Sequence, residues 1–273
     1  MSMFCARRSP VGETSHVCFF LISYPPSCIM DRVRSLHDAP SPADMPGRPP
    51  LPPARQISLM QGGNDMEKRS NYDATRDKME REFVRYDQEA MIRKFRLRHT
   101  PEHIFINLVG ETYRVDRLTG RVELCSSGAA CTHAGFNESM TIFDVLCCSK
   151  PGCQLDGSYL TVTSLPGISN ISAPGSGTYA GTARLFAGDC DGLRRACQRL
   201  DGTPQDIGDV SYLIPLFDFM PVMLQFWDAD DEFDAVLKIM WDRNTLDFMH
   251  FETTFYAAAH LLKRLEEVAH TFS

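Results

Sequence analysis

The chain has 273 residues, and 43% of them are hydrophobic, so its length allows one or two domains and its composition allows a sizeable core. A formal net charge of −7 and an isoelectric point of about 5.6 provide no basic surface of the kind that binds nucleic acid or an anionic membrane. No apolar run approaches the ~18 residues that a membrane-spanning helix needs. We therefore expect a protein whose partners include neither nucleic acid nor a membrane.

Ten cysteines are many for a chain of this length. A secreted, disulfide-bonded protein needs a signal peptide, and the best candidate is the short apolar run 17–22. No small-residue cleavage site follows that run. We therefore interpret the cysteines as reduced thiols in a cytoplasmic protein.

Residues 1–65 differ in composition from the rest, because they hold ten of the seventeen prolines and no lysine. Proline removes backbone donors and fixes φ, so the segment 37–55 predicts neither a helix nor a central strand. The Gln-Gly-Gly at 61–63 can be encoded by a purine-rich stretch typical of a bacterial ribosome-binding sequence shortly before Met66. We expect 1–65 to be a disordered or mistranslated leader, and 66–273 to form a single domain that carries the function.

The first half of this domain predicts helices followed by short strands. Apolar residues near helical spacing indicate one or two helices at the start, and they are Met79, Phe83, Tyr86, Ala90 and Phe95. Runs rich in β-branched and aromatic residues then predict strands at 103–109, 111–116 and 121–124, separated by Gly110 and a turn. A short helix is expected at 140–148, a strand at 158–167 and another helix at 190–200.

The last third predicts three strands and a closing helix. The strands are expected at 211–217, 221–227 and 233–241. Period-two spacing in the last strand puts five apolar side chains on one face, namely Phe233, Ala235, Leu237, Ile239 and Trp241. Helical spacing gives the closing helix one apolar stripe, formed by Phe251, Phe255, Ala258, Leu262, Leu265 and Ala269. Because the strands cluster, we predict an α+β fold with a largely antiparallel sheet packed against N- and C-terminal helices.

The segment from about residue 70 to 270 resembles the family catalogued as Domain of Unknown Function 3786 (DUF3786). The resemblance rests on a Gly-Asp pair, two prolines, an aromatic residue followed by Asp-Glu-Phe, and a Ser-Leu-Pro-Gly strand end. These elements are Gly208, Asp209, Pro215, Pro221, Trp227, Asp231, Glu232, Phe233 and 164–167. The resemblance implies an uncharacterised protein of anaerobic bacteria and archaea, with no catalytic residue to carry over and no known cofactor.

The chain departs from the family pattern at two points. His250 stands where the family tends to have a proline before the last helix. The four-cysteine iron–sulfur module that is joined to some relatives is missing.

The acidic segment 228–232 lies between two apolar arms and could be a cation site or a hairpin turn. Carboxylates suit hard cations, but the Asp-x-Asp-x-Asp-Gly spacing of a calcium loop is absent. Five residues fit a hairpin connection, with Trp227 opposite Phe233 and with Asp231 or Glu232 bound to turn backbone donors. We predict a turn that also offers a ligand or partner surface, made of Asp209, Trp227, Asp230, Asp231 and Glu232 together with Gly175 and Gly177 of a glycine-rich loop.

The cysteine group is the main alternative, because it could hold zinc or an iron–sulfur cluster. It comprises Cys125, Cys131, Cys147, Cys148 and Cys153. The spacing is not that of a zinc ribbon, which needs paired Cys-x2-Cys knuckles. His250 with Glu252, and His260, are further candidates for acid–base chemistry, although a histidine at a helix start more often makes local hydrogen bonds.

These patterns favour an uncharacterised cytoplasmic module that binds a small ligand or a protein partner in anaerobic metabolism. The alternative is an enzyme or a metal or iron–sulfur accessory protein that uses the cysteines between Cys125 and Cys153. The sequence leaves open whether the protein is an enzyme.

Overall fold

The computed structural model describes residues 71–126, 128–168 and 179–270. The chain divides into two units, Met1–Glu67 and Lys68–Ser273, and all the described residues belong to the second. The expected leader at 1–65, and Gly175 and Gly177 of the glycine-rich loop, therefore lie outside the described residues.

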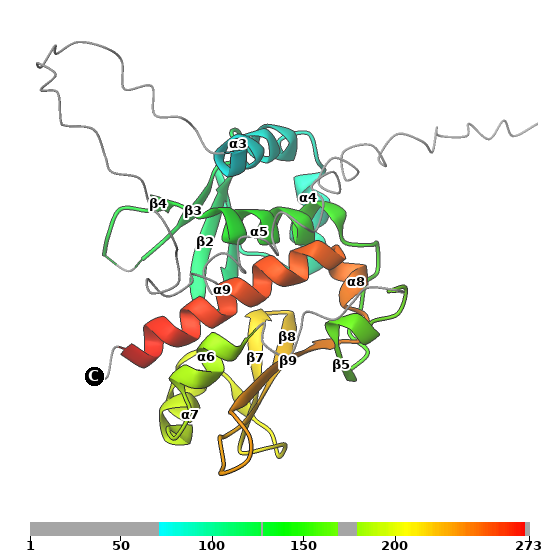
Figure 1. The fold of residues 1–273 in the computed structure, drawn as a ribbon. Helices are drawn as coiled ribbons and strands as arrows, with labels where there is room; N and C mark the ends of the chain where they lie inside the picture. The colour runs from blue at the N-terminus through cyan, green and yellow to red at the C-terminus, as the bar shows by residue number, and fades with distance from the viewer. Residues whose placement is uncertain (1–70, 127, 169–178, 271–273) are drawn as a thin grey trace, which may run out of the picture. The chain divides into compact units, whose positions relative to one another are not determined.

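The first sheet is a four-stranded antiparallel meander in the order β1-β2-β3-β4 (Figure 1). Its strands are β1 (His103–Leu108), β2 (Glu111–Asp116), β3 (Val122–Leu124) and β4 (Thr132–His133). The β1–β2 turn consists of Val109 and Gly110, with φ values of 48° and 73°. A two-residue turn of this kind needs positive φ at both positions, which is costly for a β-branched residue. Val109 is buried, and its N–H donates to Leu216 O at 2.9 Å, which links this turn to the second sheet.

The second sheet has five antiparallel strands in the order β5-β9-β8-β7-β6. The strands are β5 (Tyr159–Thr161), β6 (Thr203–Pro204), β7 (Val210–Phe217), β8 (Met220–Trp227) and β9 (Val236–Asp242). β7 and β8 form a hairpin whose turn holds Asp218 and Phe219. β7 and β8 are mostly buried along their length, as expected for strands in the interior of the sheet.

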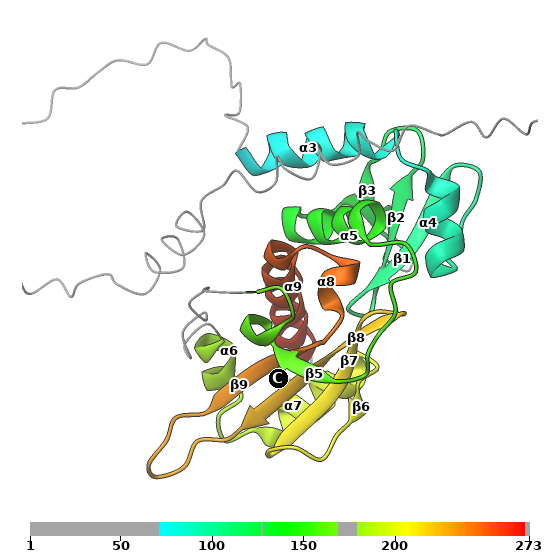
Figure 2. The same ribbon diagram turned by 90° about the vertical axis from the view of Figure 1, so that its right-hand side faces the viewer.

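The helices pack between and beside the two sheets (Figures 1 and 2). They are α3 (Asn71–Phe83), α4 (Gln88–Phe95), α5 (Phe136–Cys148), α6 (Ala180–Leu185), α7 (Cys190–Arg199), α8 (Thr245–Phe248) and α9 (Phe251–His270), with a 3-10 turn η1 at Val162–Ser164. α9 packs against both α5 and α7, and α3 packs on α5. Large buried side chains fill these contacts, and each contributes roughly 1.5–3 kcal/mol by leaving water; they include Phe83, Phe143, Tyr113, Phe226 and Trp241.

The α+β class and the antiparallel pairing are confirmed, but the strands form two sheets where we expected one. The apolar face of the last strand is confirmed at Ala235, Leu237, Ile239 and Trp241. It is wrong at Phe233, which is 69% exposed because β9 begins only at Val236.

The apolar stripe of the last helix is partly wrong. Ala258 and Leu265 are buried as expected, whereas Phe251 and Leu262 are only half-buried. Ala257, Leu261 and even His260 are buried as well. The buried arc is wider than one stripe because α9 has neighbours on two sides.

Candidate functional site

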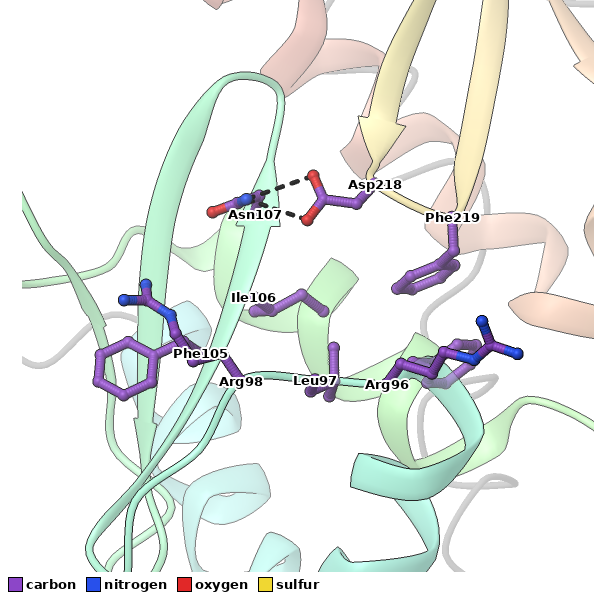
Figure 3. Close-up of a pocket in the computed structure, with 9 residues that line it drawn as sticks. Arg96, Leu97, Arg98, Phe105, Ile106, Asn107, Asp218 and Phe219 are labelled. Atoms are coloured by element: carbon purple, nitrogen blue, oxygen red, sulfur yellow. Dashed lines mark hydrogen bonds between the residues drawn. The ribbon is translucent and has the colours of Figure 1, made fainter.

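Two neighbouring cavities lie where the β1–β2 hairpin approaches the β7–β8 turn. Their volumes are about 350 Å³ and 310 Å³, and both are lined by Asn107 and Asp218. The Asn107 amide donates to Asp218 Oδ2 at 3.0 Å (Figure 3). The Thr112 hydroxyl donates to Asn107 Oδ1 at 2.8 Å and so holds the amide in place. This polar bridge therefore stands between the two cavities and joins the two sheets.

Basic side chains border the larger cavity. The run 93–99, at the end of α4 and just beyond it, contains three arginines, a lysine and a histidine in a chain of net negative charge. Arg96 and Arg98 line the cavity and are exposed, and neither has an ion-pair partner in the part of the chain that the structure describes. Arg96 can turn the chain here because it adopts the left-handed conformation, with φ 52°, at the C-cap of α4.

Aromatic rings supply the apolar walls of the same cavity. Phe95 and Phe219 are stacked with ring centroids 4.2 Å apart. The Arg98 guanidinium lies 4.4 Å from the centroid of the Phe105 ring, within cation–π range. Figure 3 places Arg98 with Phe105 on one side and Arg96 with Phe219 on the other. The lining combines aromatic rings and guanidinium groups with the Asp218 carboxylate, a mixture typical of small-molecule sites.

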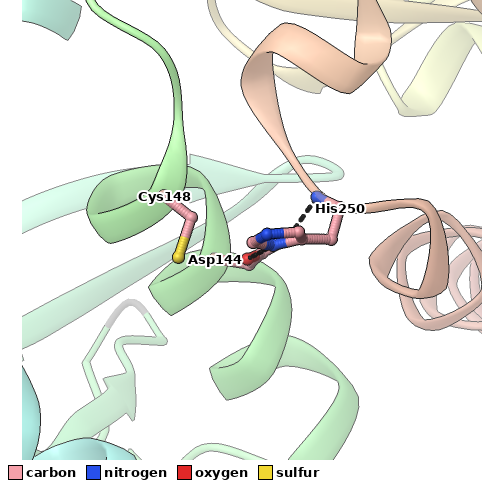
Figure 4. A group of neighbouring side chains, drawn as sticks. All are labelled: Asp144, Cys148 and His250. Atoms are coloured by element: carbon pink, nitrogen blue, oxygen red, sulfur yellow. Dashed lines mark hydrogen bonds and ion pairs between the residues drawn. The ribbon is translucent and has the colours of Figure 1, made fainter. Parts of the chain in front are cut away.

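A second group of polar side chains lies where the end of α5 meets the start of α9. Asp144, Cys148 and His250 offer a carboxylate oxygen, a thiol sulfur and a ring nitrogen that all lie within 4.8 Å of one another (Figure 4). Among the described residues, this is the one group of three or more His, Cys, Asp or Glu side chains placed to hold a metal ion. Sequence reasoning considered Cys148 and His250 separately and missed Asp144.

The Asp144 carboxylate accepts hydrogen bonds from three donors. Its Oδ1 accepts from His250 Nδ1 at 2.6 Å, and its Oδ2 accepts from the His250 N–H at 2.7 Å and from the Thr253 hydroxyl at 2.6 Å. Burial alone would raise the pKa of Asp144, but these bonds and the His250 charge lower it. The same hydrogen bond, which His250 donates to Asp144, raises the pKa of His250. Asp144 thus caps the N-terminus of α9 and orients the imidazole, which leaves Nε2 for a proton or a metal.

The five cysteines of the expected metal cluster do not form one set of ligands in the described structure. Cys125 and Cys131 are close, with their Sγ atoms 2.7 Å apart beside β3 and β4. Cys147 and Cys148 end α5, and Cys153 follows in the next loop, where burial raises its pKa.

The acidic segment closes a hairpin, as predicted, because β8 and β9 pair in antiparallel fashion. The connection is longer than predicted, since Trp227 pairs with Val236, and the expected Trp227–Phe233 pair is wrong. Asp230 Oδ1 accepts from the N–H groups of both Glu232 and Phe233 at 2.8 Å. The turn is therefore built by Asp230, whereas the backbone contacts expected for the Asp231 or Glu232 side chain are absent from the described interactions.

Asp209 and Asp228 are used by the fold at the base of this hairpin. Asp209 Oδ2 accepts from the Asp228 N–H, and Asp228 Oδ1 accepts from the Gly188 N–H, both at 2.8 Å. Gly208 has φ 66°, and a Cβ there would lie 2.7 Å from Phe226 O, so only glycine fits. The Gly-Asp pair thus holds the chain that leads into β7 against the end of β8.

Trp227 is half-buried, with the Lys238 ammonium 4.6 Å from the centroid of its ring. Asp231 and Glu232 are exposed. These two acidic side chains are therefore accessible to a partner, and neither has a side-chain hydrogen bond or ion pair with another of the described residues.

The sequence also failed to indicate a buried network of charged side chains, of which only His260 was a candidate residue. His260 Nδ1 lies 3.1 Å from Glu138 Oε1, at an orientation that forms no aligned hydrogen bond. Glu111 Oε1 lies 3.3 Å from Arg264 NH1, and its Oε2 accepts from the Tyr113 hydroxyl at 2.9 Å. Burial would raise the pKa of Glu138, but His260 outweighs it and holds this pKa at about 2. The signal in the sequence is the i, i+4 spacing of His260 and Arg264 on the inner side of a helix.

The two antiparallel sheets and the helices that pack on them define an α+β protein. A family model described as a domain of unknown function (DUF3786) matches residues 87–264, and the chain belongs to this family. No curated protein and no solved structure matches the chain. Among the described residues, no helix has both the length and the apolar character needed to cross a membrane.

Proposed function

We propose that the domain binds a small, flat, anionic metabolite in the larger junction cavity. The observation that carries the proposal is the combination, in one cavity, of aromatic walls with Arg96 and Arg98, which have no ion-pair partner among the described residues. A volume of about 350 Å³ is at the lower end of the range for small-molecule sites.

The chemistry of the walls indicates the class of ligand. Guanidinium groups bind carboxylates and phosphates through paired hydrogen bonds. Arg98 lies against one face of the Phe105 ring, and Phe95 stacks on one face of the Phe219 ring, so a planar group would extend these stacks. Each added aromatic contact is worth about 0.5–1.5 kcal/mol beyond its buried area. Asp218 would accept a hydrogen bond from an N–H donor on that ring. A purine mononucleotide combines all three features.

The proposal is tested by thermal unfolding of the full chain with AMP, adenosine or inorganic phosphate. Saturating AMP should raise the midpoint by several degrees, because a linkage energy of 1 kcal/mol shifts a domain of this size by roughly 2–4 °C. Adenosine lacks the anion and phosphate lacks the ring, so each alone should shift the midpoint less.

A matched pair of variants locates the site. Replacing both Arg96 and Arg98 by Gln should abolish the AMP shift. Arg93→Gln removes a charge from the same basic run without touching the cavity lining, and it should leave the shift unchanged. A shift that survives the double substitution, or no shift with any of the three probes, would contradict the proposal.

The wider setting is part of the same proposal. The family resemblance and the reduced thiols support a role in the cytoplasm of an anaerobe. The β8–β9 hairpin supports an additional contact with a protein partner, because Phe233 is 69% exposed next to Asp231 and Glu232. Replacing Phe233 by Ser should weaken such a contact without changing AMP binding.

Metal binding is the second candidate function, and the group of Asp144, Cys148 and His250 favours it. Thiolate, imidazole and carboxylate are all ligands that suit zinc, and the three side chains would supply one ligand atom each. Anaerobic purification followed by metal analysis tests this candidate. Stoichiometric zinc in the unaltered protein that is lost in Cys148→Ser would support this candidate. Unaltered protein purified without bound metal would contradict it.

A further inference from the structure

Two cysteines face each other at the loop end of the β3–β4 hairpin, where Cys125 follows β3 and Cys131 precedes β4. β3 and β4 pair with Glu123 opposite His133 and with Leu124 opposite Thr132. Continuing this register by one position puts Cys125 opposite Cys131, and their Sγ atoms are 2.7 Å apart. Both are thiols and both are partly exposed.

The register also suits a bond between the two sulfurs. The Ala134 N–H donates to Val122 O at 2.9 Å, so these two residues form a hydrogen-bonded pair of the ladder. Such pairs alternate with non-hydrogen-bonded pairs, in which the Cα atoms are only about 4.5 Å apart and the side chains are closest. By this alternation Cys125 and Cys131 occupy a non-hydrogen-bonded position. That spacing lies at the short end of the Cα separations, about 4.4–6.8 Å, found in disulfides.

The surroundings distinguish the two thiols. Burial raises the pKa of Cys125 to about 11, with Cys131 adding to the rise and the Arg114 charge opposing it. A thiol with so high a pKa is a poor first nucleophile, because the thiolate is the attacking form. Cys125 therefore suits the second step, in which its sulfur already lies 2.7 Å from Cys131 Sγ.

We propose that Cys125 and Cys131 form a thiol–disulfide exchange site whose co-substrate is a small-molecule disulfide such as oxidised glutathione. The Cys131 thiolate attacks one sulfur of the disulfide, its S–S bond breaks, and one glutathione thiolate leaves. Cys125 then loses its proton to solvent and attacks Cys131 Sγ in the mixed disulfide, which releases the second glutathione. Two cysteine thiols are oxidised and one small disulfide is reduced to two thiols.

This site is separate from the ligand cavity and does not depend on the proposed function. The reduced full chain is incubated with oxidised glutathione, and the remaining thiols are then alkylated. Cleavage after glutamate releases the peptide 124–138, which contains Cys125 and Cys131 and no other cysteine. We expect this peptide to escape alkylation and to be lighter than its reduced form by two hydrogen atoms.

Three variants complete the test. Cys125→Ser should trap the mixed disulfide of Cys131 with glutathione, because the second step is lost. Cys131→Ser should leave Cys125 without an internal partner, so its peptide should show no loss of two hydrogen atoms. Cys190→Ser removes another partly exposed thiol and should leave the internal link intact. The proposal is overturned if peptide 124–138 of the unaltered protein is fully alkylated, or if its cysteines link only to cysteines elsewhere in the chain.

Discussion

The acidic β8–β9 loop and the single carboxylate of Asp144 perform the same task in different surroundings. Asp230 accepts two backbone N–H groups at an exposed turn. Asp144 accepts one backbone N–H and two side-chain donors with its side chain only 1% exposed. Water can replace the hydrogen bonds of the first group but not those of the second, so an isolated buried acid contributes more than a dense exposed cluster.

This contrast explains why the acidic segment 228–232 is prominent in the sequence although its hydrogen bonds contribute little to stability. Four acidic residues in a row of five are conspicuous in the sequence, yet two of them serve the turn and its base, and Asp231 and Glu232 face solvent. Asp144 stands alone among apolar residues of α5, where the cost of burying a charge demands partners. If burial, and not the number of neighbouring acidic residues, determines how much a carboxylate stabilises the fold, substitutions of these residues should differ in their effect on the free energy of unfolding.

The largest effect is expected for Asp144→Asn. The change leaves His250 and Thr253 with a neutral partner in a buried place, and we expect the free energy of unfolding to fall by about 2–3 kcal/mol. Chemical denaturation measures this loss. Asp191→Asn, at an exposed ion pair with Arg194, is the control and should barely change the free energy of unfolding. A loss below about 0.5 kcal/mol for Asp144→Asn would remove the basis of the comparison.

The Asp144–His250 pair should also make stability depend on pH. The folded pKa of His250 is raised, so its contribution is fully present below its unfolded pKa of about 6.5 and is lost as pH rises through the folded value. The folded pKa of Asp144 is lowered, so its contribution is present above about pH 4 and is lost in acid.

The pH dependence is measured by denaturing the unaltered protein and His250→Gln from about pH 5 to about pH 8.5, a range that spans the ordinary histidine pKa. The unaltered protein should lose roughly 1 kcal/mol more than the variant across this range, since solvent reaches the 37% exposed ring and screens the pair. Parallel curves for the two proteins would show that His250 does not titrate against Asp144.

Much of the fold could be predicted because it depends on local patterns. The alternation at Leu237, Ile239 and Trp241 marks a strand buried on one face, and the structure agrees. In the sequence the alternation extends back to Phe233. In the structure the Phe233 N–H donates to the Asp230 side chain, and pairing with β8 starts only at Val236. Strand ends are decided by such side-chain competition for backbone donors, which periodicity does not register.

The candidate sites could be predicted only in part, because they are assembled from distant segments. The basic run at 93–99 is visible in the sequence, but Asp218 and Phe219 come from a turn more than a hundred residues later. Asp144 meets His250 only because α5 and α9 pack together. The Cys125–Cys131 pair is the exception, since a hairpin register brings both cysteines together within a few residues.

A smaller effect is expected for Asp230→Ala in the hairpin turn. The change removes the acceptor for the Glu232 and Phe233 N–H groups, which water then solvates, so we expect a loss of about 0.5–1.5 kcal/mol. Hydrogen exchange of these two amides and chemical denaturation would both report it. Asp230→Asn keeps an oxygen acceptor and should recover most of the loss. Equal losses in the two variants would mean that charge, and not the acceptor, matters at this position.

The smallest effect is expected when Asp231→Asn and Glu232→Gln are combined. Both side chains are exposed, and removing two like charges relieves repulsion, so the free energy of unfolding should change by less than about 0.5 kcal/mol and could increase. Denaturation is repeated with an excess of calcium, magnesium or manganese, because closely spaced carboxylates are the ligands that these ions prefer. We expect no ion to shift the midpoint of either protein. If an ion stabilised the unaltered protein strongly and left the double variant unchanged, the loop would be a cation site, and acidic density would have been the correct guide.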